Sequence, residues 1–110
     1  MNRKNKLFGD ILNCISKIEN RIENNFDFEK YAQNEIIQES VERNLITIGE
    51  AVNNLLKLDA EIKISNARKI VNARNKLTHG YDDIEITQVW SIVVKHLPIL
   101  KSEVENLIQN

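Results

Sequence analysis

The segment from Arg74 to Tyr81 reads R-N-K-L-T-H-G-Y and contains the two residues of this chain best suited to phosphate chemistry. They are Arg74 and His79, five positions apart. A guanidinium pairs with phosphate oxygens through a planar fork of donors. An imidazole gains and loses a proton near neutral pH, which few other side chains do. The pair therefore indicates phosphate contact combined with proton transfer.

A helix over residues 65 to 79 would position both side chains. At about 100° per residue its apolar side chains form one stripe, and Arg74 falls within that stripe. A charge among aliphatic side chains is costly unless a negative or polar group meets it. His79 falls about 140° away, so either the end of the helix turns it towards Arg74 or two copies of the helix combine. The stripe consists of Ala67, Ile70, Val71 and Leu77, and an adjoining polar face consists of Arg68, Asn72, Asn75 and His79.

Local signals mark both ends of this helix. Ser65 is a suitable N-cap, because a serine oxygen can accept from an unpaired backbone N–H of the first turn. Gly80 is a suitable stop, because glycine adopts the left-handed conformation without steric cost. His79 then lies in the last turn, where the helix dipole favours the protonated imidazole.

The composition indicates a single domain over residues 1–110. The chain is 42% hydrophobic and 28% charged, which argues against disorder. Its three Gly, one Pro and 5% aromatic residues favour helices over sheets. Cys14 is the only cysteine, so an internal disulfide and a thiolate metal cluster are excluded, and we interpret it as a core residue. With no signal peptide and no apolar run of roughly 18 residues, we expect a cytoplasmic protein without membrane contact.

The charge is unevenly distributed. The net charge of −1 argues against a protein that coats a duplex, for which a basic patch is the usual footprint. Residues 65 to 79 nevertheless contain four basic residues and no acid. A local basic strip on an acidic body suits a protein that handles phosphate at one place, and we expect no DNA binding. The basic residues of the strip are Arg68, Lys69, Arg74 and Lys76.

Apolar residues repeat at three- and four-residue spacing along most of the chain, which is typical of amphipathic helices. We expect an all-α, up-and-down bundle of four main helices with short connections. Pro98 should kink or divide the last helix near His96 and Leu97, because proline lacks a backbone N–H. Asp82 and Glu85 fit a capping box at the start of that helix. The main helices are expected at 5–24, 35–57 and 65–79 and, after the Asp82 capping box, in a last helix whose apolar stripe runs from Ile86 to the C-terminus, with a short helical turn at 28–31.

Other side chains leave alternatives open. Arg43 and Glu50 are seven residues apart on one helix face, where they either pair with a neighbouring helix or line a cleft with Arg74. His96 has no second histidine or carboxylate at ligand spacing, so we interpret it as an ordinary helix-face histidine and expect no metal site. An aromatic cluster is interpreted as part of the core rather than as a base-stacking platform. Its members are Phe26, Phe28 and Tyr31.

Other types of catalytic site are missing from the sequence. There is no Gly-rich phosphate loop, no H-E-x-x-H motif and no pair of carboxylates on one face. Asn75 would orient its neighbours, and Thr78 or Tyr81 would supply a hydroxyl. On residue types alone, Arg74 and His79 are either catalytic or structural.

Four stretches resemble one protein family. The segment I-V-N-A-R-N-K-L-T-H-G-Y is similar to the R-x-x-x-x-H motif of the HEPN superfamily, in the R-N-x-x-x-H-x-Y form of HepT-like toxins. The stretch G-D-I-L-N-C-I-S-K-I-E resembles the family's first helix, E-R-N-L-I-T-I-G-E-A its second conserved helix, and V-W-S-I-V-V-K-H-L-P-I-L-K its last. Many relatives have a longer connector before the motif helix, with proline and tryptophan, where this chain has only residues 59 to 64.

The resemblance implies a metal-independent endoribonuclease that works as a homodimer, with the two motifs facing across a shared cleft and without a cofactor. Arg74 would stabilise charge on the phosphate, His79 would transfer protons, and Asn75 and Thr78 would support them. Cleavage through the RNA's own 2′-hydroxyl needs a base, an acid and a counter-charge, and a two-fold axis supplies a second histidine. The residues considered for RNA contact are Arg43, Arg68, Lys69 and Lys76.

The same resemblance implies a protein partner. HepT-like toxins are neutralised by a small nucleotidyltransferase antitoxin that attaches AMP to the tyrosine of the H-x-Y motif, and Tyr81 occupies that position. AMP would place negative charge in front of Arg74 and block RNA entry. Without the resemblance, Tyr81 would be interpreted as packing over the helix end.

Two alternatives from other functional classes remain at this point. In the first, the chain is a non-catalytic helical dimer that binds a nucleotidyltransferase or a nucleotide, and Arg74 and His79 form a structural pair. In the second, it is a plain helical interaction domain with a solvated basic strip. Substitution of Arg74 and His79 separates catalysis from binding.

Overall fold

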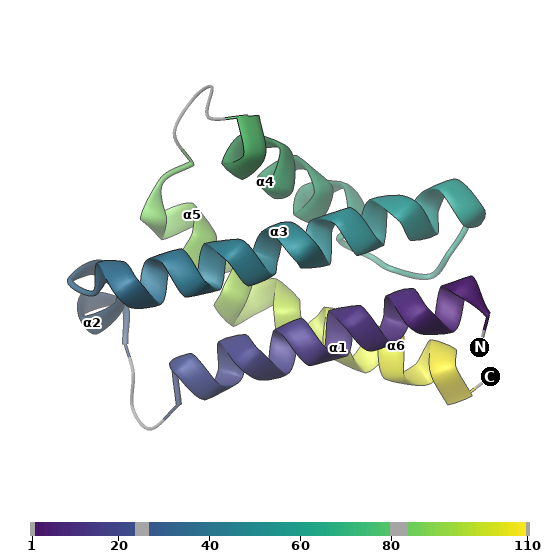
Figure 1. Ribbon diagram of the computed structural model, residues 1–110, viewed down its shortest axis with the longest axis horizontal. Helices are drawn as coiled ribbons and strands as arrows, with labels where there is room; N and C mark the ends of the chain where they lie inside the picture. Colours follow the sequence, from purple (N-terminus) through teal and green to yellow (C-terminus); the bar gives the residue numbers. More distant parts are fainter. Residues whose placement is uncertain (1, 24–26, 80–83, 110) are drawn as a thin grey trace.

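Two long antiparallel helices, α1 (Arg3–Arg21) and α3 (Glu35–Leu58), form the centre of the fold (Figure 1). The protein is described by a computed structural model that covers residues 2–23, 27–79 and 84–109. The remaining elements are α2 (Phe28–Ala32), α4 (Ala67–His79), α5 (Ile86–Ser91), the π-helical turn η1 (Ile92–His96) and α6 (Leu97–Gln109). No strand occurs in these ranges, so the prediction of an all-α bundle is confirmed.

The helices begin where short polar side chains cap them. The side-chain oxygen of Asn2 accepts from the backbone N–H of Asn5 at 2.7 Å, and that of Asn34 accepts from Ile37 at 3.0 Å. Such caps satisfy N–H groups that have no partner within the helix. The observed ends differ from the predicted ones by a few residues, because α1 ends at Arg21 and α3 continues to Leu58.

The core lies where α1, α3 and the C-terminal helices meet. Ile11 of α1 and Leu45 and Ile48 of α3 are fully buried, as their spacing predicts. Cys14 is buried among them, and burial raises the pKa of its thiol, which confirms its interpretation as a core residue. Within the described chain, no helix is both long and apolar enough to cross a membrane.

The aromatic residues close one end of the bundle. The ring centroids of Tyr31 and Trp90 are 5.1 Å apart, and those of Phe28 and Trp90 are 6.3 Å apart. Tyr31 is fully buried and Phe28 packs against the core, so their interpretation as core residues is confirmed. Phe26 lies outside the described residues.

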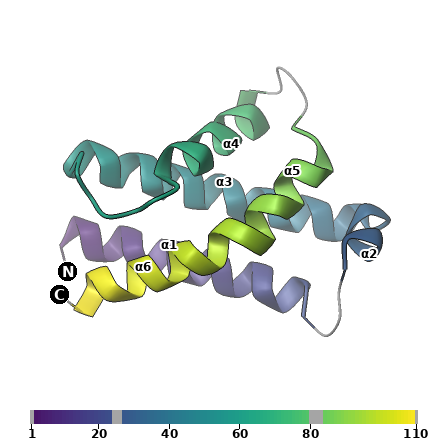
Figure 2. The same cartoon turned by 180° about the vertical axis from the view of Figure 1, so that it is seen from behind.

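The last helix is divided as predicted, but by a wider turn rather than a break. The residues from Ile92 to His96 form a π-helical turn, in which the N–H of Leu97 donates to the carbonyl oxygen of Ile92. Pro98 follows directly and has no N–H to donate, so the widened turn lies where α-helical bonding cannot continue. Figure 2 shows that α5, η1 and α6 form one bent run whose end lies beside the start of α1.

Two predicted helix starts are wrong. Helix α5 begins at Ile86 and not after Asp82, and its first turn is closed by Gln88, whose side chain accepts from the N–H of Glu85 at 3.1 Å. Asp82 itself lies outside the described residues. Helix α4 begins at Ala67, so Asn66 and not Ser65 is the residue directly before it.

Candidate functional site

Arg74 is fixed at the contact between α4 and α3. Its side chain lies over Gly49, so that a β-carbon added to Gly49 would come within 2.9 Å of Arg74 Cγ and 3.3 Å of the Ile70 carbonyl oxygen. Only glycine allows the two helices to approach so closely at this point. The sequence placed Arg74 within the apolar stripe, and the structure shows what meets it there, which is the bare backbone of α3.

The guanidinium of Arg74 is held from one side. Its Nη1 donates to Oδ1 of Asn75 at 2.7 Å, so Asn75 orients the arginine. Its Nε is buried and has no hydrogen-bond partner within the described chain. A buried donor without an acceptor costs free energy, so the packing of α4 on α3 holds Arg74 in this position at a cost.

Thr78 and His79 complete the last turn of α4. The hydroxyl of Thr78 donates to the carbonyl oxygen of Arg74, so in this structure it serves its own helix. His79 is exposed and still helical, so the helix end does not turn it towards Arg74. The two side chains leave α4 about 140° apart. Gly80 and Tyr81, the predicted stop and modification site, lie outside the described residues.

The remaining predicted contacts divide into two groups. Arg43 and Glu50 are both exposed on α3, and the helical repeat places them about 100° to 120° from Gly49. They therefore lie beside the α3 face that carries Arg74 rather than on it. Arg68, Lys69 and Lys76 are exposed on α4, and the two lysines face a groove on its other side.

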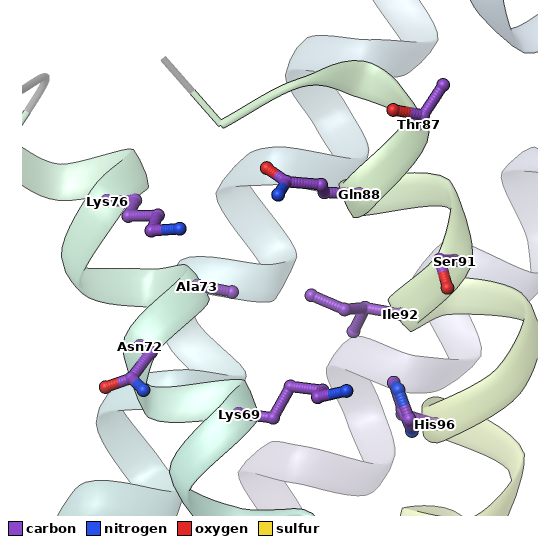
Figure 3. Close-up of a pocket in the computed structure, with 9 residues that line it drawn as sticks. All are labelled: Lys69, Asn72, Ala73, Lys76, Thr87, Gln88, Ser91, Ile92 and His96. Atoms are coloured by element: carbon purple, nitrogen blue, oxygen red, sulfur yellow. The ribbon is translucent and has the colours of Figure 1, made fainter. Parts of the chain in front are cut away.

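This groove, called the α4–α5 groove from here on, has a volume of about 590 Å³ (Figure 3). Helix α4 supplies one wall, with Lys69, Asn72, Ala73 and Lys76. The opposite wall comes from α5 and η1, with Thr87, Gln88, Ser91, Ile92 and His96. The lining contains two lysines and no acidic residue, so the groove favours an anionic ligand.

His96 faces Lys69 across the α4–α5 groove (Figure 3). Its Nδ1 is buried and has no hydrogen-bond partner within the described residues. The pKa of His96 is lowered, first by burial and then by the charges of Lys69 and Lys95. A neutral imidazole offers one donor and one acceptor. Because His96 lines the groove, it is more than the ordinary helix-face residue that the sequence indicated.

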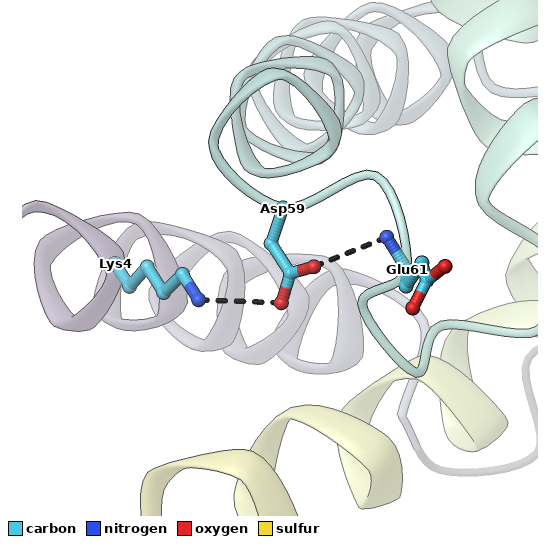
Figure 4. A network of polar contacts seen from close by, with 3 residues as sticks. All are labelled: Lys4, Asp59 and Glu61. Carbon is cyan, nitrogen blue, oxygen red and sulfur yellow. Dashed lines mark hydrogen bonds and ion pairs between the residues drawn. The ribbon is translucent and has the colours of Figure 1, made fainter.

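The short connector before α4 is tied to the bundle at both ends. Asp59 accepts from Lys4 Nζ of α1 at 3.3 Å and from the N–H of Glu61 at 3.1 Å (Figure 4). At the other end, the N–H of Ser65 donates to the carboxylate of Glu103 on α6, at 3.0 Å to the nearer oxygen. These contacts hold the connector that leads into α4. They thereby help to set the position of Arg74 along the axis of α3.

Sequence reasoning missed Gly49 and the far wall of the groove. Gly49 lies inside the 24-residue helix α3, and a glycine inside a helix costs about 1 kcal/mol relative to alanine. That cost was a signal that another element packs closely there. The spacing of Gln88, Ser91 and Ile92 was a signal for one helix face, but nothing in the sequence showed that this face lies opposite Lys69.

Within the described residues, no three His, Cys, Asp or Glu side chains gather closely enough to hold a metal ion. Arg74, Asn75 and the α4–α5 groove are thus the features on which a functional assignment can be based. Arg74 and Asn75 belong to α4, which also forms one wall of the groove and ends in His79.

Comparison with known proteins gives a consistent result. Residues 11–107 match the family of HepT-like ribonucleases. Two proteins of Methanocaldococcus jannaschii, each named as a candidate RNase, are 31% identical over 103 residues, covering 92% of this chain and 84% and 87% of their own lengths. A similarly named protein of Caldanaerobacter subterraneus subsp. tengcongensis is 32% identical over 84 residues, covering 74% of each chain. No solved structure matches this chain.

Proposed function

The chain belongs to the HepT-like ribonuclease family, and on that premise we propose that it is a metal-independent endoribonuclease acting as a homodimer. Arg74 and His79 of each chain contribute to one composite site that cleaves RNA. The relatives named as candidate RNases support RNA as the substrate.

The observation that carries this proposal is the state of Arg74. Its guanidinium is half-buried, oriented by Asn75 at 2.7 Å, and has a buried Nε without a partner within the described chain. A donor fixed in advance stabilises developing charge without the cost of reorganisation during the reaction. An RNA phosphate approaching along α4 would meet a partly exposed guanidinium whose position is already set.

The proposed reaction requires a base and an acid. One imidazole takes the proton of the 2′-hydroxyl while the 2′-oxygen attacks phosphorus, and the bond from phosphorus to the 5′-oxygen breaks. The leaving oxygen takes a proton from a second, protonated imidazole, which leaves a 2′,3′-cyclic phosphate. Since Arg74 and His79 leave one helix about 140° apart, a second copy of α4 is the simpler way to bring both groups to one phosphate.

The proposal includes membership of a toxin–antitoxin pair. A partner nucleotidyltransferase transfers AMP from ATP to the hydroxyl of Tyr81, two residues after His79 in the H-x-Y motif, and pyrophosphate leaves. The added phosphate carries negative charge to the end of α4, where it competes with RNA for Arg74. The support for this part is the sequence motif alone.

Cleavage of a labelled RNA in EDTA tests the enzymatic proposal. Wild type, freed of AMP as judged by intact mass, should release a product ending in a 2′,3′-cyclic phosphate. The His79→Ala protein at equal dimer content should be slower by roughly 10²- to 10⁴-fold. Arg21→Ala, an exposed change at the end of α1, serves as the control that should cut like wild type.

Two results would contradict the proposal. Absence of cutting by unmodified wild type would favour the non-catalytic dimer that binds a nucleotidyltransferase or a nucleotide. Cutting that continues in the His79→Ala protein would assign the activity to another residue or to a contaminating nuclease. Cutting that needs an added divalent ion would remove only the metal-independent part.

A further inference from the structure

The α4–α5 groove lies on a different side of α4 from Arg74. Taking Arg74 as the origin and about 100° per residue, His79 is about 140° round the helix and the two groove lysines are about 200° to 220° round. The groove is thus next to the face of His79 and opposite the face packed on α3. Lys76 is three residues before His79, or about 4.5 Å along the axis.

The lining of the groove is chemically divided. Lys69 and Lys76 supply positive charge on the α4 wall, and Gln88 and Ser91 supply hydrogen-bonding groups on the α5 wall. Ile92 belongs to the η1 part of the second wall and points towards α4, so it forms the apolar base of the groove (Figure 3). A phosphate, a sugar with hydroxyls and a flat base with polar edges together match this combination of charge, polar and apolar groups.

The size and the unmet hydrogen bonding of the groove agree with a ligand. Its volume of about 590 Å³ falls within the roughly 300 to 1,000 Å³ typical of small-ligand sites. The buried Nδ1 of His96 has no partner within the described residues and lies on the groove wall that Lys69 faces. Because almost none of this nitrogen is accessible, a ligand in the groove would satisfy it only after a small rotation of the imidazole ring.

We propose that the α4–α5 groove binds one unpaired nucleotide of the RNA substrate, with its phosphate at Lys69 and Lys76 and its base against the α5 wall, within reach of Gln88 and Ser91. This inference rests on the proposed function for its choice of RNA as the source of the nucleotide. A base in a duplex is stacked on both faces, so the groove selects single-stranded RNA.

A salt titration with uncleavable RNA tests the phosphate contacts. The ligand is a fluorescently labelled single strand methylated at every 2′-oxygen, and affinity is read by anisotropy at several salt concentrations. Each lost phosphate contact lowers the slope of log K against log salt by about 0.7. The double variant Lys69→Gln/Lys76→Gln frees the one phosphate that both lysines contact, so it should lose about 0.7 from the slope and bind roughly tenfold more weakly at low salt.

The control is Lys17→Gln/Lys57→Gln, which removes two exposed lysines from α1 and α3 outside the groove. It should keep the slope of wild type if the contacts are local. A groove variant that binds with the affinity and slope of wild type, or a control variant that loses as much as the groove variant, would overturn the proposal.

Ser91→Ala separates hydrogen bonding to the base from attraction of charge, because it removes a groove hydroxyl and leaves the capping box of Gln88 in place. It should weaken binding of the methylated strand several-fold with the slope unchanged, because no charge is removed. AMP, titrated alone and followed by NMR of the groove amides, tests the source of the nucleotide. Equal affinities for AMP and for the strand would overturn the assignment to RNA.

The methylated strand also keeps this test independent of the chemistry, because it lacks the attacking hydroxyl. If wild type cuts unmodified RNA but the groove variants bind as wild type does, the groove proposal fails and the enzymatic one stands. If the groove variants lose binding but wild type never cuts, the enzymatic proposal fails and the groove remains an RNA site.

Discussion

The two sides of α4 are built in opposite ways. Towards α3, Arg74 lies on the bare backbone of Gly49, is oriented by Asn75, and has lost most of its freedom. Towards α5, Lys69 and Lys76 are exposed along a groove of about 590 Å³. The first side holds one cation by packing and a hydrogen bond, and the second carries two exposed cations at the edge of an open space.

This difference separates two tasks. A group that stabilises a transition state must be held within a narrow range of positions by the residues around it. A group that attracts a flexible strand gains little from such rigidity, because a lysine is a point charge with rotatable donors. We expect changes on the α3 side to alter the rate of the chemical step, and changes in the groove to alter the RNA concentration that is needed.

Arg74→Ala should produce the largest effect on activity. Loss of a preorganised charge-stabilising donor lowers kcat by roughly 10²- to 10³-fold. Lys69→Gln should instead raise KM several-fold with kcat nearly unchanged, since it weakens binding in the ground state and the transition state alike. Steady-state cleavage of one labelled RNA by both variants measures the contrast. A KM effect from Arg74→Ala alone would remove the distinction between the two sides.

The contact between α4 and α3 can also be disrupted without changing a polar residue. In Gly49→Ala, the new methyl group meets Arg74 Cγ at 2.9 Å and the Ile70 carbonyl oxygen at 3.3 Å, so α4 must move away from α3. Overpacking of this kind costs about 1 to 3 kcal/mol of folding free energy. Cleavage should fall as well, because the shift displaces Arg74.

Gly9→Ala is the matched control, since nothing lies within 4 Å of a β-carbon at Gly9 in α1. It should stabilise the protein by about 0.5 to 1 kcal/mol through helix propensity. Urea unfolding of both variants checks the pair. Equal stabilities for the two variants would mean that the close approach at Gly49 is absent in solution.

More of the side of α4 that faces α3 could be predicted from the sequence than of the side that faces α5. Helical spacing placed Arg74 in an apolar stripe and His79 about 140° away, and both placements depend only on the repeat within one helix. The role of Gly49 required knowing that α4 crosses α3 at that residue. Prediction of the groove required knowing that Gln88 and His96 face Lys69. These residues lie in segments far apart in the sequence, and no local pattern shows that the segments meet.

The start of α5 was missed for a related reason. Asp82 with Glu85 and Glu85 with Gln88 both have the three-residue spacing of a capping box, so spacing alone does not choose between them. The structure selects the second pair, because Glu85 is the N-cap of α5 and both bonds of its capping box with Gln88 are formed. The position of Pro98, in contrast, acts through a missing N–H within its own helix, and its effect was predicted at the correct place.

The smallest expected effect lies on the side of α4 that faces α5, in the titration of His96. Burial lowers the pKa of His96 below its usual value of 6.5, and the charges of Lys69 and then Lys95 lower it further. Lys69→Gln removes one of the two repulsions, so the pKa should rise but stay below 6.5, because burial remains. Ring-proton NMR titration follows His96 separately from His79, and Lys95→Gln tests the second lysine in the same way. An unchanged pKa in Lys69→Gln would mean that the lysine does not face the imidazole.

The sign of the accompanying stability change follows from the same shift. Because the unfolded chain protonates His96 at a higher pH than the folded chain does, folding free energy is lost as the pH falls from 6.5 through the lowered pKa. The Lys69→Gln protein should lose less over that range, which urea titrations at several pH values can measure. A nucleotide phosphate in the groove acts in the opposite direction to Lys69, since its charge favours the imidazolium. Addition of the methylated strand should therefore raise the pKa of His96 in wild type, which links this smallest effect to occupancy of the groove.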